Sequence, residues 1–145
     1  MKRILVVDDD KILCRLTCDI LSVEGYCAVP AFNAAEALDA FARESFDVLV
    51  TDLRMPGMNG LELARRVHEQ DPDMPVIMVT GYGPIEDEDI TVCLAKEEMF
   101  PKVLDVIVSC VSEAKNLAHS HRSSHPVSLT NPGRDPSLSG WKTSR

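Results

Sequence analysis

The chain has 145 residues, a 45% apolar fraction and a formal net charge of −8, which suits one globular domain because about 100–150 residues is the commonest domain size. Residues 1–117 carry 11 Lys and Arg against 22 Asp and Glu, which argues against nucleic-acid binding because the phosphate backbone is also negative. No apolar stretch approaches the roughly 20 residues of a membrane span, and Lys2-Arg3 is followed by only four apolar residues rather than a secretory signal, so we expect a cytoplasmic protein without membrane association.

Strands and helices alternate along the first half of the chain. Residues 3–8 are predicted as a strand, and the unbroken apolar run Ile4–Val7 is typical of a parallel strand that is covered on both faces. A helix is predicted over residues 11–24, ended by Gly25. Its expected buried face consists of Ile12, Leu13, Leu16, Ile20 and Leu21. A second strand follows at residues 27–31, and Asn33 with Glu36 forms a capping-box pattern for a helix that runs to about residue 44.

Cys14 and Cys18 lie one helical turn apart in the first predicted helix. This spacing is compatible with a metal or redox pair, but free cysteine is commonly buried, so we expect two small core residues. The five cysteines are odd in number and include no Cys-x-x-Cys pair, which agrees with a cytoplasmic protein.

The second half continues the alternation. Strands are predicted at residues 47–51 and 75–80, with a helix over residues 60–70 between them that Asn59 and Glu62 cap. We then expect a helix from Pro84 to about Ala95 and a short fifth strand that contains Met99 and Phe100. The last predicted helix covers residues 103–117, with a core stripe of Leu104, Ile107, Val108 and Val111.

The composition changes at about residue 118. Residues 119–145 are rich in Ser and Pro and hold few large apolar groups, too few to offset the entropy of ordering them. We therefore expect one domain over residues 1–118 and a disordered tail over 119–145. Three tail histidines, His119, His121 and His125, leave open a loose metal site, although incidental solvated side chains are the simpler interpretation.

Acidic residues follow two of the predicted strands. Asp52 comes directly after Val48–Thr51 and before a Pro/Gly loop, and Asp8-Asp9-Asp10 ends the run Ile4–Val7. Ligand sites of open parallel sheets lie at the carboxyl ends of the strands. Carboxylates a few ångströms apart repel by about 4 kcal/mol per pair at an effective dielectric constant near 20. Such a cluster therefore needs a cation, and hard oxygen ligands suit Mg²⁺.

Two further polar residues follow later strands. Thr80 comes after Val76–Val79, and Lys102 comes after Met99-Phe100-Pro101. A hydroxyl donor and an ammonium charge are what a phosphoryl group requires from its surroundings.

Taken together, these segments resemble the response-regulator receiver domain of two-component signalling. The resemblance covers about residues 1–118, and the wording is closest to the receivers of nitrogen-regulation-type transcription activators. It rests on four motifs in order, namely Ile4–Asp10, Thr51–Gly60, Val79-Thr80-Gly81 and Pro101-Lys102. It implies an α/β fold: a doubly wound, five-stranded parallel sheet of order 2-1-3-4-5 with five helices and right-handed crossovers.

The resemblance also implies roles for individual residues. Asp52 would accept a phosphoryl group from a histidine kinase or a phosphotransfer protein. Asp8, Asp9, Asp52 and the backbone carbonyl of Arg54 would hold Mg²⁺. Lys102 would pair with the phosphoryl oxygens, and Thr80 would donate a hydrogen bond to one of them. Such a chain is a signalling phosphoacceptor that assists its own modification rather than an enzyme acting on other substrates.

The output side of the domain departs from the family pattern. The family's switch position lies three residues before the lysine and is usually Tyr or Phe. Counted from Lys102, this position is Met99. Val103 stands where the family usually has proline. We expect the face formed by the fourth helix, fifth strand and fifth helix to meet a downstream protein or a second copy of the chain.

Two other functions remain open at this point. The first is an interaction module with the receiver fold whose output does not depend on phosphate, and the residues at 99 and 103 favour it. The second is a Mg²⁺-dependent phosphohydrolase with an aspartate nucleophile. Asp52-Leu53-Arg54 lacks the second acid of the Asp-x-Asp motif of such enzymes, which argues against it.

Overall fold

A computed structural model describes residues 1–100 and 102–111 of the chain. Its centre is a five-stranded sheet in which all neighbouring strands are parallel. The strands are β1 (Arg3–Val7), β2 (Cys27–Ala31), β3 (Val48–Asp52), β4 (Val76–Thr80) and β5 (Val92–Ala95). Their order, β2-β1-β3-β4-β5, confirms the expected topology. The tail predicted for residues 119–145 lies outside the described residues.

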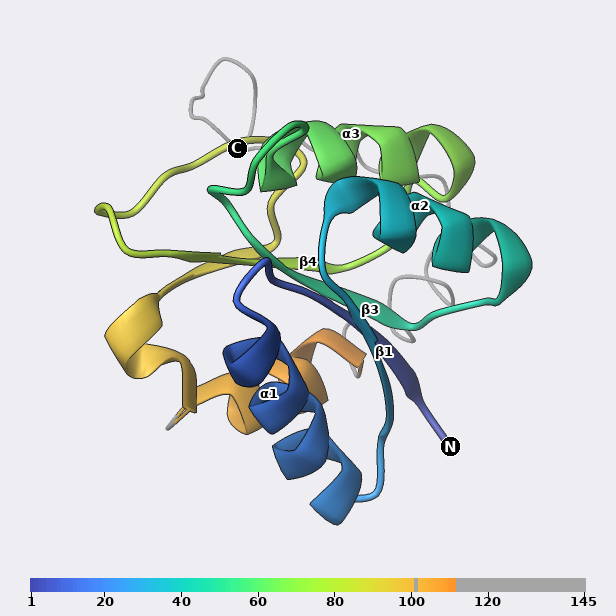
Figure 1. The fold of residues 1–145 in the computed structure, drawn as a ribbon, viewed down its shortest axis with the longest axis vertical. Coiled ribbons are helices and arrows are strands. Elements are labelled where there is room, and N and C mark those ends of the chain that lie inside the picture. The colour runs from blue at the N-terminus through green and yellow to red at the C-terminus, as the bar shows by residue number, and fades with distance from the viewer. Residues whose placement is uncertain (101, 112–145) are drawn as a thin grey trace, which may run out of the picture.

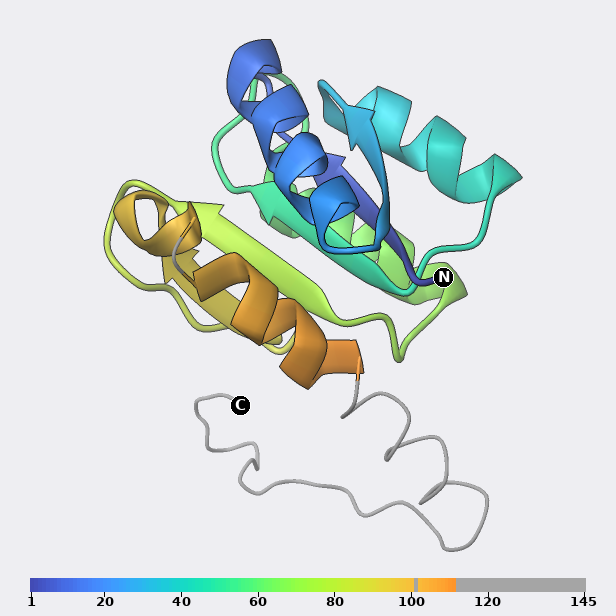
Figure 2. The ribbon, with the colours of Figure 1, turned by 90° about the horizontal axis from the view of Figure 1, so that it is seen from below.

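Helices cover both faces of this sheet (Figures 1 and 2). Helices α2 (Ala34–Arg43) and α3 (Gly60–Gln70) lie on one face, and α1 (Lys11–Val23) lies on the other with the C-terminal helix, residues 99–100 and 102–111. Strands β3 and β4 are buried along their whole length, which explains their continuous apolar sequence. Within the described residues, no helix is long and apolar enough to cross a membrane.

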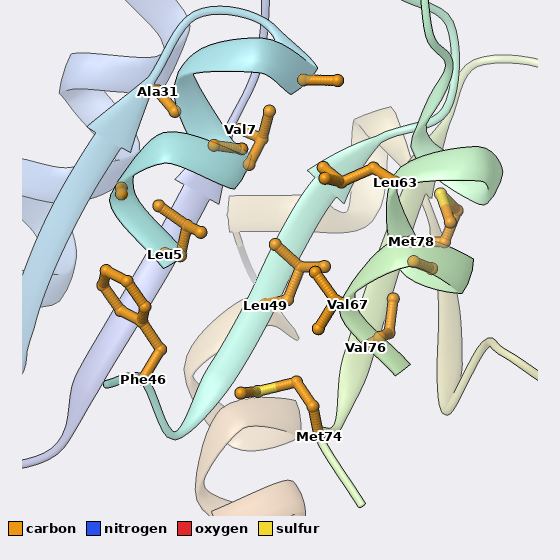
Figure 3. Packing of buried hydrophobic residues seen from close by; sticks show 14 of the residues in the cluster. Leu5, Val7, Ala31, Phe46, Leu49, Leu63, Val67, Met74, Val76 and Met78 are labelled. Atoms are coloured by element: carbon orange, nitrogen blue, oxygen red, sulfur yellow. The ribbon is translucent and has the colours of Figure 1, made fainter. Parts of the chain in front are cut away.

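Each face of the sheet has its own core. Figure 3 shows the core beneath α2 and α3, where Leu63 and Val67 of α3 lie over Leu49 and Val76 of the sheet. The opposite core joins Ile4 and Ile77 of the sheet to α1 and the C-terminal helix. Two cores on one sheet fix the central strands from both sides and hold their carboxyl ends at a common edge.

The predicted helix starts are confirmed by side-chain caps. The Asp10 side chain accepts a hydrogen bond from Leu13 N at 3.1 Å and so begins α1. Asn33 caps α2 in the same way, by accepting from Glu36 N at 2.8 Å. Asn59 and Glu62 form the full capping box of α3. Because the first and third of these caps closely follow β1 and β3, they also fix the loops around the aspartates.

Helix α1 does not bury the face predicted from its sequence. Its buried residues are Cys14, Thr17, Cys18 and Leu21. The prediction is wrong for Ile12 and Leu16, whose exposed fractions are 82% and 46%. The expectation that Cys14 and Cys18 are small core residues is confirmed, and the helix turns them inward in place of the larger side chains. In the C-terminal helix, Val108 is likewise exposed rather than part of the core stripe.

The segment after β4 differs most from expectation. The helix predicted from Pro84 to Ala95 is wrong, because residues 81–91 are not helical and β5 occupies Val92–Ala95. Asp87 gives the physical reason: its side chain accepts a hydrogen bond from Asp89 N, and its carbonyl accepts one from Ile90 N, both at 3.0 Å. Such local bonds from aspartate compete with helix formation. We call residues 81–91 the crossover segment.

Two apolar side chains of the crossover segment take the place of a helix on this face. Ile85 and Ile90 are partly buried against the core beneath α2 and α3. The fifth strand predicted at Met99 and Phe100 is also wrong, since both residues are helical and follow the short 3₁₀ helix η1 (Lys96–Glu98). Both residues instead pack into the opposite core, in which Met99 is buried and Phe100 is partly buried at the edge.

Candidate functional site

Three aspartates meet at the carboxyl edge of the sheet, as the sequence predicts. Asp8, Asp9 and Asp52 each offer a carboxylate oxygen, and these oxygens all lie within 4.8 Å of one another. The pairing of Val7 with Thr51 in β1 and β3 brings Asp8 and Asp52, the next residue on each side, together. Asp8 and Asp52 are each 6% exposed, whereas Asp9 is exposed. Three hard oxygen donors with one open side fit Mg²⁺, which keeps several of its waters.

Backbone contacts hold the two buried aspartates in place. Asp8 N donates to the Ala31 carbonyl at 3.1 Å, and the Asp8 carboxylate accepts from Asp10 N at 2.9 Å. At Asp52 the support comes from α3: a Cβ on Gly60 would lie 2.2 Å from the Asp52 carbonyl oxygen. Only glycine therefore allows the first residue of α3 to approach the backbone of Asp52 this closely.

Burial is the main reason that the pKa of Asp8 is raised from its ordinary value. The hydrogen bond from Asp10 N and the charge of Lys96 oppose the rise, and the charges of Asp52 and Asp9 add to it. The charged form of this buried carboxylate therefore costs free energy in the folded protein, even with the Lys96 ammonium group nearby.

We expect Asp8→Asn to stabilise the metal-free protein at neutral pH. Because the folded-state pKa of Asp8 is raised, its contribution to stability is fully present below the ordinary value of 3.8 and is lost as the pH rises through the folded-state pKa. Asparagine retains the acceptor for Asp10 N and carries no charge, so a gain of about 1 kcal/mol is expected. Urea unfolding in EDTA measures it.

The exposed Asp9 offers a matched control for this prediction. Asp9→Asn removes the same charge from the same cluster without relieving a buried group, so its effect should be smaller. The gain from Asp8→Asn should also shrink as the pH falls towards about 4. An Asp8→Asn gain that is absent at neutral pH, or that grows on acidification, would contradict the prediction.

Lys96 supplies the positive charge of the site. It follows β5 directly, and its Nζ lies 3.2 Å from Asp52 Oδ2. Burial alone would lower the pKa of Lys96, but the hydrogen bond and charge of Asp52, with the charges of Asp8 and Asp9, raise it overall. The ammonium group therefore remains charged beside the aspartates at neutral pH.

Lys102, the lysine predicted for this place, lies elsewhere. Its side chain is exposed on the C-terminal helix, where Nζ lies 3.0 Å from Glu98 Oε2, one helical turn away. The error follows from the misplaced fifth strand. The signal for the correct lysine is present in the sequence, because the apolar run Val92–Ala95 ends at Lys96 just as Ile4–Val7 ends at Asp8.

Thr80 closes β4 beside this cluster, as expected. It is buried, and its Oγ1 accepts a hydrogen bond from Tyr82 N at 3.0 Å. The hydrogen bonds of the described residues give its hydroxyl proton no acceptor, so that proton can serve an oxygen bound in the site. Nearby, the Arg54 guanidinium lies over the Tyr82 ring, 4.4 Å from its centroid. Metal binding by the Arg54 carbonyl stays a prediction.

Because Lys96 is the lysine of the site, the family's switch position falls on a residue other than Met99. Met99 is buried in the core beside α1 and the C-terminal helix rather than on a strand next to Thr80. Three residues before Lys96 stands Cys93, which is partly buried on β5 and pairs with Met78 of β4. A switching role for either residue stays a prediction.

Comparisons with known proteins place this site in a family. A family model described as the response regulator receiver domain matches residues 4–107. The receiver protein CpdR of Brucella abortus is 40% identical over 85 residues, covering 59% of this chain and 71% of that protein. The transcriptional regulator GlrR of Escherichia coli is 42% identical over 84 residues, but the match spans only 19% of its length.

A solved structure has the same fold with a ligand in place. The response regulator TrrA of Thermotoga maritima, in complex with Mg²⁺ and beryllofluoride, is 31% identical with a TM-score of 0.70. The alignment covers 76% of this chain and 99% of TrrA. TrrA has also been solved in complex with the histidine kinase ThkA.

Proposed function

Because the chain belongs to the response-regulator receiver family, we propose that it is a phosphorylation-dependent switch in which Asp52 accepts the phosphoryl group of a phosphohistidine. The donor would be a histidine kinase or a phosphotransfer protein. The observation that carries this proposal is the position of Asp52, buried between two further aspartates and 3.2 Å from the Lys96 ammonium group. As a receiver domain, the chain is a signalling phosphoacceptor.

The reaction follows from the groups around Asp52. A carboxylate oxygen of Asp52 forms a bond to phosphorus as the phosphorus–nitrogen bond of the donor breaks, and the nitrogen keeps the bonding electron pair. Lys96 then pairs with phosphoryl oxygens in place of Lys102, and Thr80 donates its hydroxyl proton to another oxygen. Mg²⁺, held by Asp8, Asp9, Asp52 and the Arg54 carbonyl, would offset the negative charge that gathers there.

Helix α1 offers a surface on which a donor protein can dock. Ile12 and Leu16 are exposed and lie one helical turn apart on α1. Ile12 is only two residues after Asp10, the N-cap of this helix, and so lies near the aspartates in the sequence. Lys11 Nζ and the Arg15 guanidinium each lie 5.4 Å from the centroid of the Phe32 ring, so both cations are held beside this apolar strip. We propose that a helix of the histidine-bearing partner binds here. The complex of TrrA with ThkA supports a kinase as partner.

The two alternative functions lose support because Lys96, not Lys102, is the lysine beside Asp52. Residues 99 and 103 no longer favour a phosphate-independent interaction module, because neither flanks the lysine of the site. Cys93 and Glu97 now occupy the positions where the family usually has Tyr or Phe and Pro. Cys93 and Glu97 therefore affect how the domain signals, and not whether Asp52 accepts a phosphoryl group. Membership of the receiver family also displaces the phosphohydrolase interpretation.

The remaining expectations belong to the same proposal. We propose a receiver domain over residues 1–118, which the family match to residues 4–107 supports. We also propose a cytoplasmic location, which agrees with the absence of a disulfide among the five cysteines, all of which are described. The predicted output face lacks its fourth helix, because residues 81–91 are not helical. We therefore propose that a downstream protein or a second copy of the chain binds to β5 and the C-terminal helix.

Incubation of the full chain with acetyl phosphate or a phosphorylated histidine kinase tests this function. We expect one phosphoryl group per chain in the presence of Mg²⁺, detected by mass spectrometry of the intact protein, and none when EDTA is present. The adduct should be labile to hydroxylamine, as acyl phosphates are. Full labelling in EDTA, or no labelling by any donor, would contradict the proposal.

A further inference from the structure

Polar side-chain contacts join the middle of the crossover segment to helix α3. His68 Nδ1 lies 2.6 Å from Asp89 Oδ1, and the two side chains are only 15% and 17% exposed. Arg65 adds contacts of 3.2 Å to Asp87 and 3.6 Å to Asp89. The other ring nitrogen of His68 lies 2.8 Å from the Met74 carbonyl oxygen, which fixes the ring. A sheltered and oriented pair of this kind contributes more than a solvent-exposed ion pair.

Both partners of this contact also reach the phosphorylation site. Helix α3 begins at Gly60, which lies directly against the Asp52 carbonyl. The crossover segment begins after Thr80, and its Tyr82 N–H is bonded to the Thr80 hydroxyl. The His68–Asp89 pair therefore closes a ring of contacts from Asp52 through α3 and the crossover segment to Thr80.

The crossover segment has few other attachments. At its far end Thr91 is fixed by two hydrogen bonds to Val76, of 2.8 and 2.9 Å. Between Tyr82 and Thr91, its hydrogen bonds within the described residues are local ones plus the contacts to Arg65 and His68. Apart from these, only Ile85 and Ile90 pack it against the core. A helix would carry its own internal hydrogen bonds and move as a unit, whereas this segment depends on its contacts with α3.

We propose that the His68–Asp89 pair restrains the crossover segment against α3 and so opposes occupation of the site at Asp52. The inference rests on the function proposed above. When the Thr80 hydroxyl turns towards a phosphoryl oxygen, its bond with Tyr82 N changes, and the start of the crossover segment moves with it. The pair holds the middle of the segment to α3 and so favours the unphosphorylated arrangement. Because coupling between sites is reciprocal, breaking the pair strengthens binding at Asp52.

Beryllofluoride with Mg²⁺ is the probe, since it occupies a phosphorylation site without a covalent step. In the full-length wild-type chain, we expect amide NMR shifts and hydrogen exchange to change across residues 81–91 when the probe binds. Asp89→Ala should lower the beryllofluoride concentration needed for half-saturation about fivefold, at the lower end of typical allosteric coupling. Glu88→Ala is the matched control, because this exposed carboxylate in the same segment makes no ion pair or hydrogen bond with the described residues.

The outcomes separate this inference from the proposed function. A wild-type chain that binds no beryllofluoride and accepts no phosphoryl group overturns both. Normal binding with unchanged amides in residues 81–91 overturns the coupling alone. Equal half-saturation for Asp89→Ala and Glu88→Ala also overturns the coupling, because it reduces the effect to one of charge. The amide measurement uses the wild-type protein, so it remains decisive if a variant folds poorly.

Discussion

Replacement of Asp52 by asparagine is expected to abolish labelling by every phosphodonor. Asparagine has nearly the same shape and can occupy the same buried position between Asp8 and Lys96. Its amide is not a nucleophile for phosphorus, so no acyl phosphate can form. Intact-protein mass spectrometry after incubation with acetyl phosphate and Mg²⁺ measures the loss directly.

Asp10 provides the matched control for that experiment. Asp10→Asn removes a nearby carboxylate but retains the side-chain oxygen that caps α1, because asparagine is an equally good cap. Its labelling should stay close to that of the wild type. Undiminished labelling of Asp52→Asn would place the phosphoryl group on another residue and refute the proposed acceptor.

Lys96→Met is expected to reduce the rate of phosphoryl transfer at least about a hundredfold. The change keeps the length and apolar stem of the side chain but removes the ammonium group 3.2 Å from Asp52. Loss of one preorganised group that stabilises developing charge commonly lowers a rate by about 10²–10³-fold. Rates of labelling at saturating phosphodonor and Mg²⁺ give the measurement.

Lys102→Met distinguishes the site lysine from the lysine expected from the sequence. Lys102 forms an exposed pair with Glu98, and such pairs contribute little, so this variant should transfer at a rate close to that of the wild type. A large loss in Lys102→Met with a small loss in Lys96→Met would show that the chain reacts in a different arrangement from the one described.

The sequence by itself determines the first four strands, the first three helices and the cluster of aspartates. These features depend on local signals: apolar runs for buried strands, and the capping side chains of Asp10, Asn33 and Asn59. Parallel strands share one carboxyl edge, and the strand order that the family resemblance implies puts β1 next to β3, so Asp8 and Asp52 meet there. For the same reason, Thr80 lies at this edge, at the end of β4.

The last part of the fold is decided by contacts between residues far apart in the sequence. Residues 84–95 suit a helix by composition, but Val92–Ala95 gains more by pairing with β4 and burying Leu94 in the opposite core. Asp87 and Asp89 then find partners in Arg65 and His68 of α3 rather than in a helix of their own. Such gains come only from the assembled sheet, and propensity along the chain cannot register them.

The identity of the site lysine and the buried face of α1 follow from the same cause. Lys96 reaches Asp52 because β5 ends beside Thr80, a pairing that exists only once β4 and β5 are in register. Helix α1 turns Cys14, Cys18 and Leu21 inward and leaves Ile12 and Leu16 exposed, because the sheet and the C-terminal helix decide which face is covered. The sequence thus indicates the proposed phosphoacceptor and the cluster of aspartates around it, whereas tertiary packing selects the lysine, the crossover segment and the surfaces left exposed.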